Sequence, residues 1–200
     1  LDEAAWVDAP IFESFRHPLT GLETRASGRL RMLYDDEALY LGVEIDDLDL
    51  HSEYDERDDP LWEADVFEFF LRPMRGKSDY FEIQTSPRGV IFDSHFERYR
   101  HPSPYGNVDF DSALELSVKA MGTFADEKLD TGYRIEARLP FQPIKDRLPA
   151  FRTPEPGADV FVNFFIVDRG KDYRSAAAAS PPFVPDYHHQ AAFARLTFLD

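Results

Sequence analysis

Hydrophobic and polar side chains alternate along most of this chain, with the period of two that is typical of β-strands. The alternation is clearest at residues 114–120 and 133–139, where Leu, Val, Ile and Ala positions are separated by Glu, Ser, Lys and Arg. Each of these two segments should bury one face and leave the other in water. Asp, Pro and Gly clusters between the alternating segments supply the turns.

Short strands of this kind recur from one end of the chain to the other. Nine are predicted, at residues 27–34, 38–46, 62–71, 80–86, 90–96, 114–120, 133–139, 159–168 and 192–199. Residues 140–148 favour one short helix, whereas 98–111 and 170–190 have the composition of loops. Many short strands with turns between them predict an all-β antiparallel sandwich, and 200 residues fit a single domain spanning residues 1–200.

Composition restricts the classes of partner. The formal net charge of -16 argues against nucleic acid and against an anionic membrane surface, because both need a basic footprint. The chain has no Cys, which excludes disulfides, thiolate metal sites and cysteine nucleophiles. No apolar run reaches the length of a membrane span. Cations and neutral ligands remain compatible with the charge.

The most informative segment is residues 60–71, which leads from an acidic loop into a strand. Its alternate Phe and Leu positions take one face, which leaves Glu68 beside Val66 and Phe70 on the other. With Trp62 at the strand entrance, this face offers a carboxylate and an aromatic ring, the groups that a neutral polyhydroxylated ligand needs. The alternative is a solvent-exposed Glu68 and a Trp62 that closes one end of the core.

Two other strands have faces of the same character. Residues 80–86 place Glu82 and Gln84 on one face, and residues 159–168 place Asn163 and Phe165 on one face. If these strands are neighbours of 62–71 in one sheet, the face becomes a platform of acceptors, amides and rings that can orient hydroxyl groups. The alternative is structural: the polar groups pair with arginines or lie under the long loop. The candidate arginines are Arg98, Arg134 and Arg138.

Acidic residues are concentrated between the second and third predicted strands and could supply oxygen ligands for calcium. They are Asp46, Asp47, Asp49, Asp55, Glu56, Asp58 and Asp59, with Asp65 close behind. The spacing is not that of an EF-hand, and a solvated acidic loop is the competing interpretation. The pair His188–His189 does not predict a shared metal, since adjacent residues of an extended segment point in opposite directions. The metal site therefore stays undetermined.

The order of the motifs resembles carbohydrate-binding module family 9 and the wider group of family-9-like domains. The segments that carry the resemblance are residues 1–6, the hairpin at 30–41, Trp-Glu-x-Asp-x-x-Glu within 60–71, residues 80–89, 162–164, Ser180-Pro181, and Phe-x-x-Leu-x-Phe at 193–198. They cover essentially the whole chain. The resemblance implies an immunoglobulin-like β-sandwich that binds glycans, often at chain ends, with structural calcium in some members.

The resemblance also implies roles for individual residues. Trp62 corresponds to one wall of the family's aromatic sugar clamp, and Glu68 to the carboxylate that binds sugar hydroxyls. Glu82 and Gln84 stand where well-characterised members have an arginine and an asparagine, and Phe165 stands where they have a glutamine. The chain departs from the family pattern at Ala179, where a tryptophan commonly forms the second wall. Tyr173, Phe183 and Tyr187 are the candidate replacements for that ring.

The sequence thus predicts a non-catalytic module that recognises a neutral glycan through Trp62, Glu68, Glu82, Gln84, Asn163 and Phe165. The alternative is a structural or interaction domain of a larger envelope or secreted protein. A glycosidase would use Glu68 and Glu82 as its carboxylate pair. A haem-binding sandwich of the DOMON type ranks last, because the candidate strands carry no axial His or Met and His95 and Met121 lie on others. The resemblance places the domain outside the cell or in the periplasm, attached to a larger polypeptide.

Overall fold

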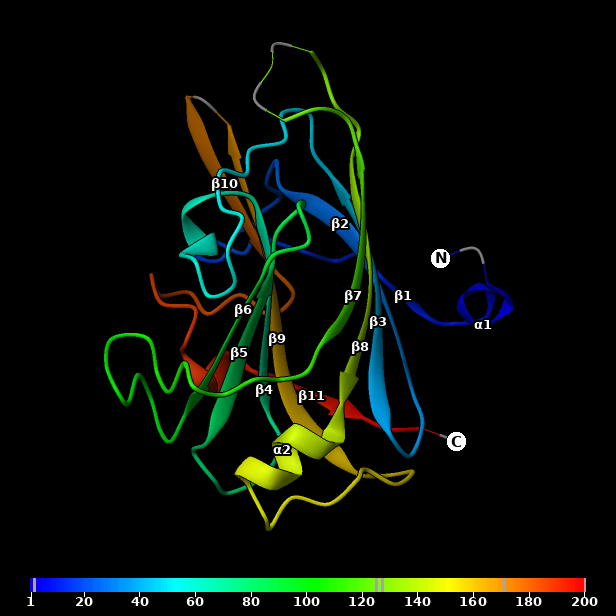
Figure 1. Cartoon of the computed structure of the whole chain (residues 1–200), viewed down its shortest axis with the longest axis vertical. Coiled ribbons are helices and arrows are strands. Elements are labelled where there is room, and N and C mark those ends of the chain that lie inside the picture. Colours follow the sequence, from blue (N-terminus) through cyan, green and yellow to red (C-terminus); the bar gives the residue numbers. More distant parts are fainter. Residues whose placement is uncertain (2, 125, 127, 171, 200) are drawn as a thin grey trace.

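The computed structural model describes residues 1, 3–124, 126, 128–170 and 172–199. Within these residues two antiparallel sheets pack face to face (Figure 1). Sheet A has the order β1 (Ile11–Phe12), β2 (Ser27–Tyr34), β3 (Ala38–Asp46), β8 (Gly132–Pro140) and β7 (Glu115–Met121). Sheet B has the order β10 (Tyr173–Ala178), β9 (Asp159–Gly170), β4 (Val66–Arg72), β5 (Tyr80–Thr85) and β6 (Ile91–Phe96), with β11 (Ala194–Thr197) also paired to β9.

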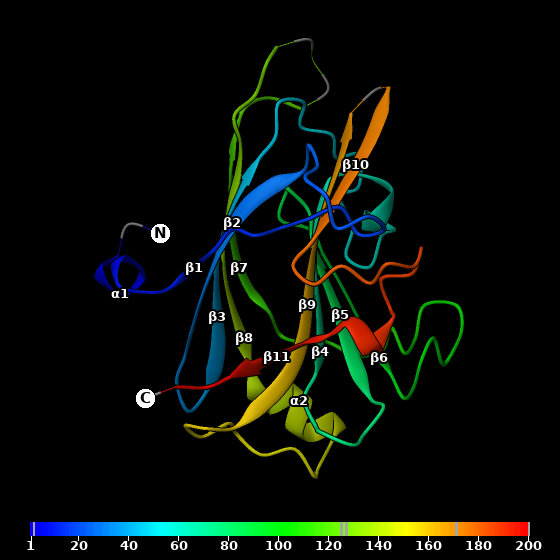
Figure 2. The same cartoon turned by 180° about the vertical axis from the view of Figure 1, so that it is seen from behind.

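Helical segments are short and peripheral. They are α1 (Ala4–Val7), α2 (Phe141–Arg147) and the two 3₁₀ turns η1 (Leu61–Glu63) and η2 (Gln190–Ala192). Helix α1 lies outside sheet A, and α2 closes one end of the sandwich, as both views show (Figure 1, Figure 2). None of the helices in the described part of the chain is long and apolar enough to cross a membrane.

The main core lies between the two sheets and follows the alternation of the sequence. In β4 the inward side chains Phe67, Phe69 and Leu71 are all buried in it. The Phe69 ring stacks on Phe164 of the neighbouring β9, with centroids 4.9 Å apart. Sheet A contributes the alternate aliphatic positions of β3 and β8, such as Val43. The period of two therefore fixes which side chains of β4 turn away from this core.

Sheet B is also covered on its outer face. A second cluster of buried side chains there consists of Phe70, Tyr80, Phe96, Phe165, Ala178 and Phe193. Segment 180–193 supplies part of the cover, because Tyr187 and Phe193 pack on this cluster. The central strands of sheet B are consequently covered on both faces, and the polar side chains of Glu68, Glu82, Gln84 and Asn163 on the outer face are buried.

The all-β antiparallel sandwich predicted from the sequence is confirmed. The prediction of residues 170–190 as irregular was wrong in part, since β10 pairs along β9 from Tyr173↔Gly170 to Ala178↔Phe165. Alanine has a low strand propensity, so local sequence gave no signal, and the pairing with β9 determines the conformation. The two-residue β1 was also missed, and the strand predicted from Trp62 begins only at Val66, after η1.

Candidate functional site

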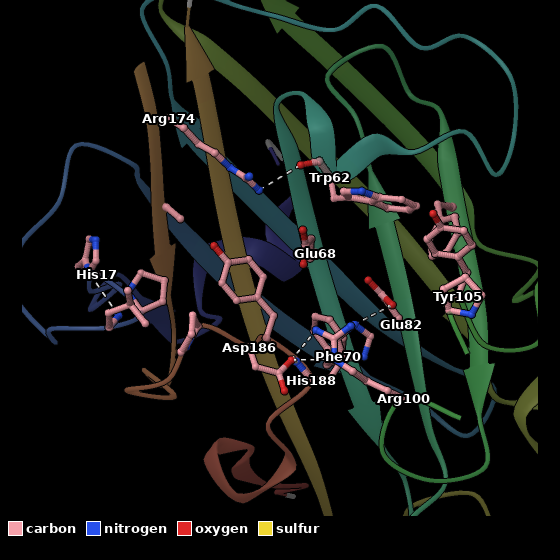
Figure 3. A pocket seen from close by; sticks show the side chains of 17 residues that line it. His17, Trp62, Glu68, Phe70, Glu82, Arg100, Tyr105, Arg174, Asp186 and His188 are labelled. Carbon is pink, nitrogen blue, oxygen red and sulfur yellow. Dashed lines mark hydrogen bonds and ion pairs between the residues drawn. The ribbon is translucent and has the colours of Figure 1, made fainter. Parts of the chain in front are cut away.

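A pocket of about 500 Å³ opens on the outer face of sheet B (Figure 3). Its floor is formed by β4, β5 and β6, and its sides by residues 17–19, 100–105 and 174–188 together with Trp62. The strand order places β4 beside β5 and β9, so side chains far apart in the sequence meet here. A concave site with a few convergent polar groups on an apolar floor is the usual form of a small-ligand site.

Glu68 and Glu82 lie on the floor of the pocket. Glu68 of β4 pairs with Gln84 of β5, and the next residue of β4 on the same face, Phe70, pairs with Glu82. The Glu68 side chain is only 2% exposed, yet none of the described residues donates a hydrogen bond to its carboxyl group. Burial raises the pKa of Glu68 well above its ordinary value, and the charge of Glu82 adds to this. Burial therefore favours the neutral form of the Glu68 carboxyl group, although the charge of Arg174 opposes this, and no described residue donates a hydrogen bond to it.

Glu82 is held by its neighbour on the same strand. Nε2 of Gln84 donates a hydrogen bond of 2.7 Å to Oε1 of Glu82. Burial raises the pKa of Glu82 to about 7, although the bond from Gln84 and the charge of Arg100 favour the ionised form. Gln84 does not line the pocket. It acts on the site only through Glu82.

His188 approaches Glu82 from segment 180–193. Its Nε2 lies 3.7 Å from Oε2 of Glu82, and its Nδ1 lies 2.8 Å from the Tyr80 hydroxyl. Burial lowers the pKa of His188 to about 4, so the ring is neutral at pH 7. The Tyr80 hydroxyl accepts a bond from the Arg100 backbone N–H, and its own proton is then directed to Nδ1. This network assigns the imidazole proton to Nε2, on the side of Glu82.

Aromatic rings border the two carboxyl groups. Trp62 stacks on Tyr105 with centroids 5.2 Å apart and an interplanar angle of 29°, and it meets Phe92 edge-on at 5.3 Å. On the other side Tyr187 stacks on Phe165, with centroids 4.1 Å apart and planes within 8°. Phe165 thus supports Tyr187 from below and does not itself line the pocket. The rings offer flat apolar surfaces beside polar groups.

Two arginines complete the site. Arg100 donates to Oδ1 of Asp186 at 2.6 Å, and this ion pair ties segment 98–111 to segment 180–193. Arg174 of β10 donates to the Trp62 carbonyl oxygen at 3.2 Å, and no described carboxylate lies within ion-pair distance of it. The other polar donors of Arg174 therefore remain free for a ligand.

A family model described as carbohydrate family 9 binding domain-like matches residues 1–181. The chain belongs to this family. Three solved structures have the same fold at low sequence identity. One is a protein from Bacteroides uniformis that is named as a candidate carbohydrate-binding protein. It is 14% identical, with a TM-score of 0.75, and the match covers 95% of this chain and 86% of that one.

The other two solved structures are of a carbohydrate-binding module family 9 domain from Caldicellulosiruptor kristjanssonii. One is a complex with cellotriose, with 16% identity, a TM-score of 0.67 and coverage of 98% of this chain and 86% of that one. The other is a complex with glucose, with 14% identity, a TM-score of 0.67 and coverage of 98% and 87%. No match was found among curated proteins.

The structure brings the predicted residues of this family-9-like domain onto one face of sheet B, but not all into the pocket. Trp62, Glu68 and Glu82 line it, while Gln84 and Phe165 lie just behind. Asn163 does not line the pocket, and its side chain bonds to the backbone instead. Its Nδ2 donates to the Ser180 carbonyl oxygen at 2.8 Å, and its Oδ1 accepts from the N–H groups of Ser180 and Phe164, both at 3.0 Å.

Ala179, which the resemblance placed at the family's second clamp wall, does not line the pocket. Ala179 packs toward the main core, and Ala176 is the alanine of this run that lines the pocket. Of the three replacement rings considered, only Tyr187 lies in the pocket. Tyr105 was missed, because nothing in the Pro- and Gly-containing segment 98–111 indicates where its side chains point.

The arginines proposed as structural partners of the platform lie elsewhere. Arg134 and Arg138 are in sheet A, where they pair with Glu44 and with Glu37 and Glu115. Arg98 lines no part of the pocket. Arg100, Arg174 and His17 were not predicted, since each lies in a segment without periodicity. His189 does not line the pocket, in contrast to His188.

Acidic side chains gather at a second place, the end of the sandwich near the start of β4. Ligand atoms of Asp47, Asp65 and Asp168 all lie within 4.8 Å of one another, and all three residues are buried. The first two belong to the predicted acidic set, whereas Asp168 comes from β9 and was missed. Burial raises the pKa of each, and that of Asp65 reaches about 9, with the charge of Asp47 contributing. Arg25, at 3.5 Å from Asp168, is the one cation that pairs with them among the described residues, and three buried carboxylates that share a single counter-ion are unfavourable at neutral pH.

The remaining predicted acidic residues do not join this cluster. Asp46 accepts a hydrogen bond from the Ser27 hydroxyl at the surface, and Asp49 is joined to Asp47 through its backbone N–H. Asp58 and Asp59 lie near β6, where the Asp58 N–H bonds to the Ile91 carbonyl oxygen. Asp55 and Glu56 are exposed.

A larger hollow of about 1270 Å³ lies at the open edge between β2 and β11. Its lining is mainly apolar and comes from residues 10–12, 30–36, 153–156 and 196–199. None of the site residues predicted from the sequence borders it. The pocket on sheet B is therefore the candidate functional site.

Proposed function

We propose that this domain binds a neutral carbohydrate in the pocket on the outer face of sheet B, without transforming it. The observation that carries the proposal is the buried Glu68 carboxyl group, which faces the pocket and has no partner among the described residues. A buried polar group without a partner is costly unless a ligand or water satisfies it. In a member of a carbohydrate-binding family, sugar hydroxyls are the matching ligand.

The chemistry of the pocket suits a polyol. In the neutral form that burial favours, the Glu68 carboxyl both donates and accepts a hydrogen bond, whereas Glu82 mainly accepts and Arg174 donates. The faces of Trp62 and Tyr187 would pack against the C–H surface of a sugar ring. The net charge of -16 disfavours the approach of anionic sugars, which supports a neutral ligand.

Titration with mono- and oligosaccharides, followed by calorimetry and tryptophan fluorescence, tests the proposal. The chain has two tryptophans, and Trp62 lines the pocket whereas Trp6 packs on Gly42 of sheet A. The variant Trp62→Ala should lose both the heat and the fluorescence change. The matched control Trp6→Phe should keep both.

A folded protein that binds no sugar would contradict the proposal and favour the interaction-domain alternative. A non-catalytic role is part of the proposal, because the family is defined by binding. Chromatography of the oligosaccharide after prolonged incubation should recover it unchanged. Release of shorter sugars that depends on Glu68 and Glu82 would instead indicate a glycosidase.

We also propose that Asp47, Asp65 and Asp168 hold a calcium ion with a structural role. Asp47 is 2% exposed, and its Oδ2 finds no donor among the described residues unless Asp65 is protonated. Carboxylate oxygens clustered in this way are the donors that calcium prefers, and a cation would offset their mutual repulsion. Calorimetric titration of the chelator-treated protein with Ca²⁺ tests whether the cluster binds it.

An extracellular or periplasmic location, as part of a larger polypeptide, fits this function. The membership of a carbohydrate-binding family supports it. Fractionation of the native cells with an antibody against the domain would detect both the compartment and the size of the full polypeptide.

A further inference from the structure

The hollow of about 1270 Å³ lies where one edge strand of each sheet ends without a further neighbour. In both views β11, paired only to β9, runs toward the turn that joins β2 to β3 (Figure 1, Figure 2). The Tyr34 hydroxyl of β2 links the two edges, since it donates a 2.6 Å bond to the Leu199 carbonyl oxygen. The hollow is therefore a gap between two strand edges, and it shares no lining residue with the pocket on sheet B.

β1 covers only part of the outer edge of β2. Its pairing ends at Ile11↔Arg31, and Pro10, the residue that comes opposite Met32, has no backbone N–H to donate. Residues 32–34 therefore have no strand beside them on this edge within the described part of the chain. An uncovered strand edge presents backbone donors and acceptors with the spacing that another strand needs.

Tyr34 supplies a donor and an acceptor of this free edge. The Asp35 N–H bonds to the Ala38 carbonyl oxygen in the turn after β2, so the odd-numbered residues of β2 direct their backbone groups to β3. Tyr34 is an even-numbered position, and its backbone N–H and C=O consequently point outward. None of the described residues forms a backbone hydrogen bond with either group. The edge is thus open at Tyr34 to an additional strand.

The floor of the hollow is apolar. It includes Leu30, Leu39 and Phe198 of the main core, and Met32, which packs on that core. A strand placed along the edge of β2 points alternate side chains to this floor and the others to water. The hollow therefore favours a segment in which large apolar and polar residues alternate.

The rim of the hollow is acidic. Asp36 and Glu155 line it, and both are exposed. No Lys or Arg lines the hollow among the described residues. A basic side chain in a bound segment would find opposite charges here. A second copy of this chain, with the same acidic rim and a net charge of -16, would be repelled.

We propose that the hollow between β2 and β11 is a docking site for an extended segment of a separate partner protein, which adds a strand to the free edge of β2. The segment pairs with the backbone of Tyr34, places alternate apolar side chains on the floor, and carries a Lys or Arg beside Asp36 and Glu155. Strand addition of this kind takes its affinity from main-chain hydrogen bonds and its selectivity from the alternate side chains.

Selection from a phage-displayed library of random dodecapeptides tests the proposal, because such a library offers alternating and non-alternating sequences alike. The enriched peptides should alternate apolar and polar residues and contain a Lys or Arg. Fluorescence anisotropy with a labelled synthetic copy of the most enriched peptide then measures its affinity for the domain. The Tyr34 amide should become protected from hydrogen exchange when this peptide binds, which nitrogen-15 NMR detects.

Two variants at one position isolate the backbone bond. Tyr34→Pro removes the free N–H, whereas the matched Tyr34→Val loses the same ring and keeps the N–H. Tyr34→Pro should bind the peptide about tenfold more weakly than Tyr34→Val. Glu155→Lys should weaken binding about fivefold, and Glu97→Lys, at an exposed position after β6, should leave it unchanged. Melting curves establish that the variants are folded, and if Tyr34→Pro is not, protection of the Tyr34 amide in the wild type decides the same question.

Enrichment of no peptide, or of peptides without alternation, would overturn the docking site. Equal affinity of Tyr34→Pro and Tyr34→Val for the peptide would do the same, because the strand edge is then not used. A dimer of the peptide-free domain in sedimentation analysis that Tyr34→Pro dissociates would assign the edge to a second copy instead.

Discussion

Nε2 of Gln84 donates a 2.7 Å hydrogen bond to Oε1 of Glu82, and only Glu82 lines the pocket. The two residues alternate on β5, so their side chains lie on the same face with one residue between them. The bond fixes the orientation of a buried carboxyl group and favours its ionised form. Gln84 is therefore a positioning residue for the site.

Replacement of Gln84 by Met should raise the pKa of Glu82 above 7, because the bond that stabilises the carboxylate is lost while burial remains. Carbon-13 NMR titration of the Glu82 carboxyl group would measure the change. Gln142→Met removes a comparable bond to Asp146 on the exposed surface of α2, and it should leave Glu82 unaffected. An unchanged Glu82 midpoint in Gln84→Met would show that the bond does not position the carboxylate.

Glu82 should also make the stability of the domain depend on pH. Its folded pKa of about 7 exceeds the unfolded value of 4.5, so its contribution is fully present below pH 4.5 and is lost as pH rises through 7. Glu82→Gln removes the ionisation and keeps the acceptor for Gln84. The variant should gain stability relative to the wild type from pH 4.5 to 8, by up to about 3 kcal/mol.

Urea denaturation of both proteins at several pH values would measure that difference. Glu97→Gln, at an exposed position after β6, serves as the control and should follow the wild type. A stability difference between Glu82→Gln and the wild type that does not change with pH would contradict the raised pKa.

Much of the platform could be predicted because strand periodicity is a local property. Alternation alone placed Glu68 with Phe70, and Glu82 with Gln84, on faces opposite the core. The adjacency of their strands was a condition of that prediction, and the strand order of sheet B fulfils it. The period of two does not reveal which polar groups are satisfied. Asn163 therefore could not be distinguished from a ligand-binding residue until its bonds to Ser180 were known.

The sides of the pocket could not be predicted, because they come from segments without periodicity. Tyr105 reaches Trp62 from a loop whose path depends on contacts such as the Arg100–Asp186 pair. Arg174 lies on a strand that forms only by pairing with β9. The place of Asp168 in the acidic cluster could not be predicted for a similar reason, because only strand pairing in the sheet brings it close to Asp65. Long-range pairing determines each of these positions, and a single sequence does not encode it in a local pattern.

Asn163→Ala should destabilise the domain by about 2–4 kcal/mol, because it leaves backbone groups of Ser180 and Phe164 without their partners. Sugar affinity should fall as well, since Ser180 begins the segment that carries Tyr187 and His188. Chemical denaturation and calorimetric titration measure the two effects. The control Asn107→Ala loses only a 3.5 Å side-chain contact with His95 and should lower the stability of the domain by less than about 1 kcal/mol. Identical unfolding curves for Asn163→Ala and the wild type would contradict this role.

Calcium should reverse the effect of Asp47→Asn on the melting temperature of the domain. In the metal-free protein burial raises the folded pKa values of Asp47, Asp65 and Asp168, that of Asp65 to about 9, so the contribution of each to stability is lost as pH rises above its unfolded pKa. Removing one carboxylate relieves the repulsion, and Asp47→Asn should melt at a higher temperature than the wild type at pH 8.

Calcium at 100 times its dissociation constant should raise the melting temperature of the wild type by about 5–10 °C, whereas Asp47→Asn should gain little. The order of the two melting temperatures then inverts. Asp36→Asn removes an exposed carboxylate and should respond to calcium as the wild type does. Equal calcium shifts in the wild type and in Asp47→Asn would place any bound ion elsewhere, because a site built on Asp47 cannot lose that ligand without losing affinity.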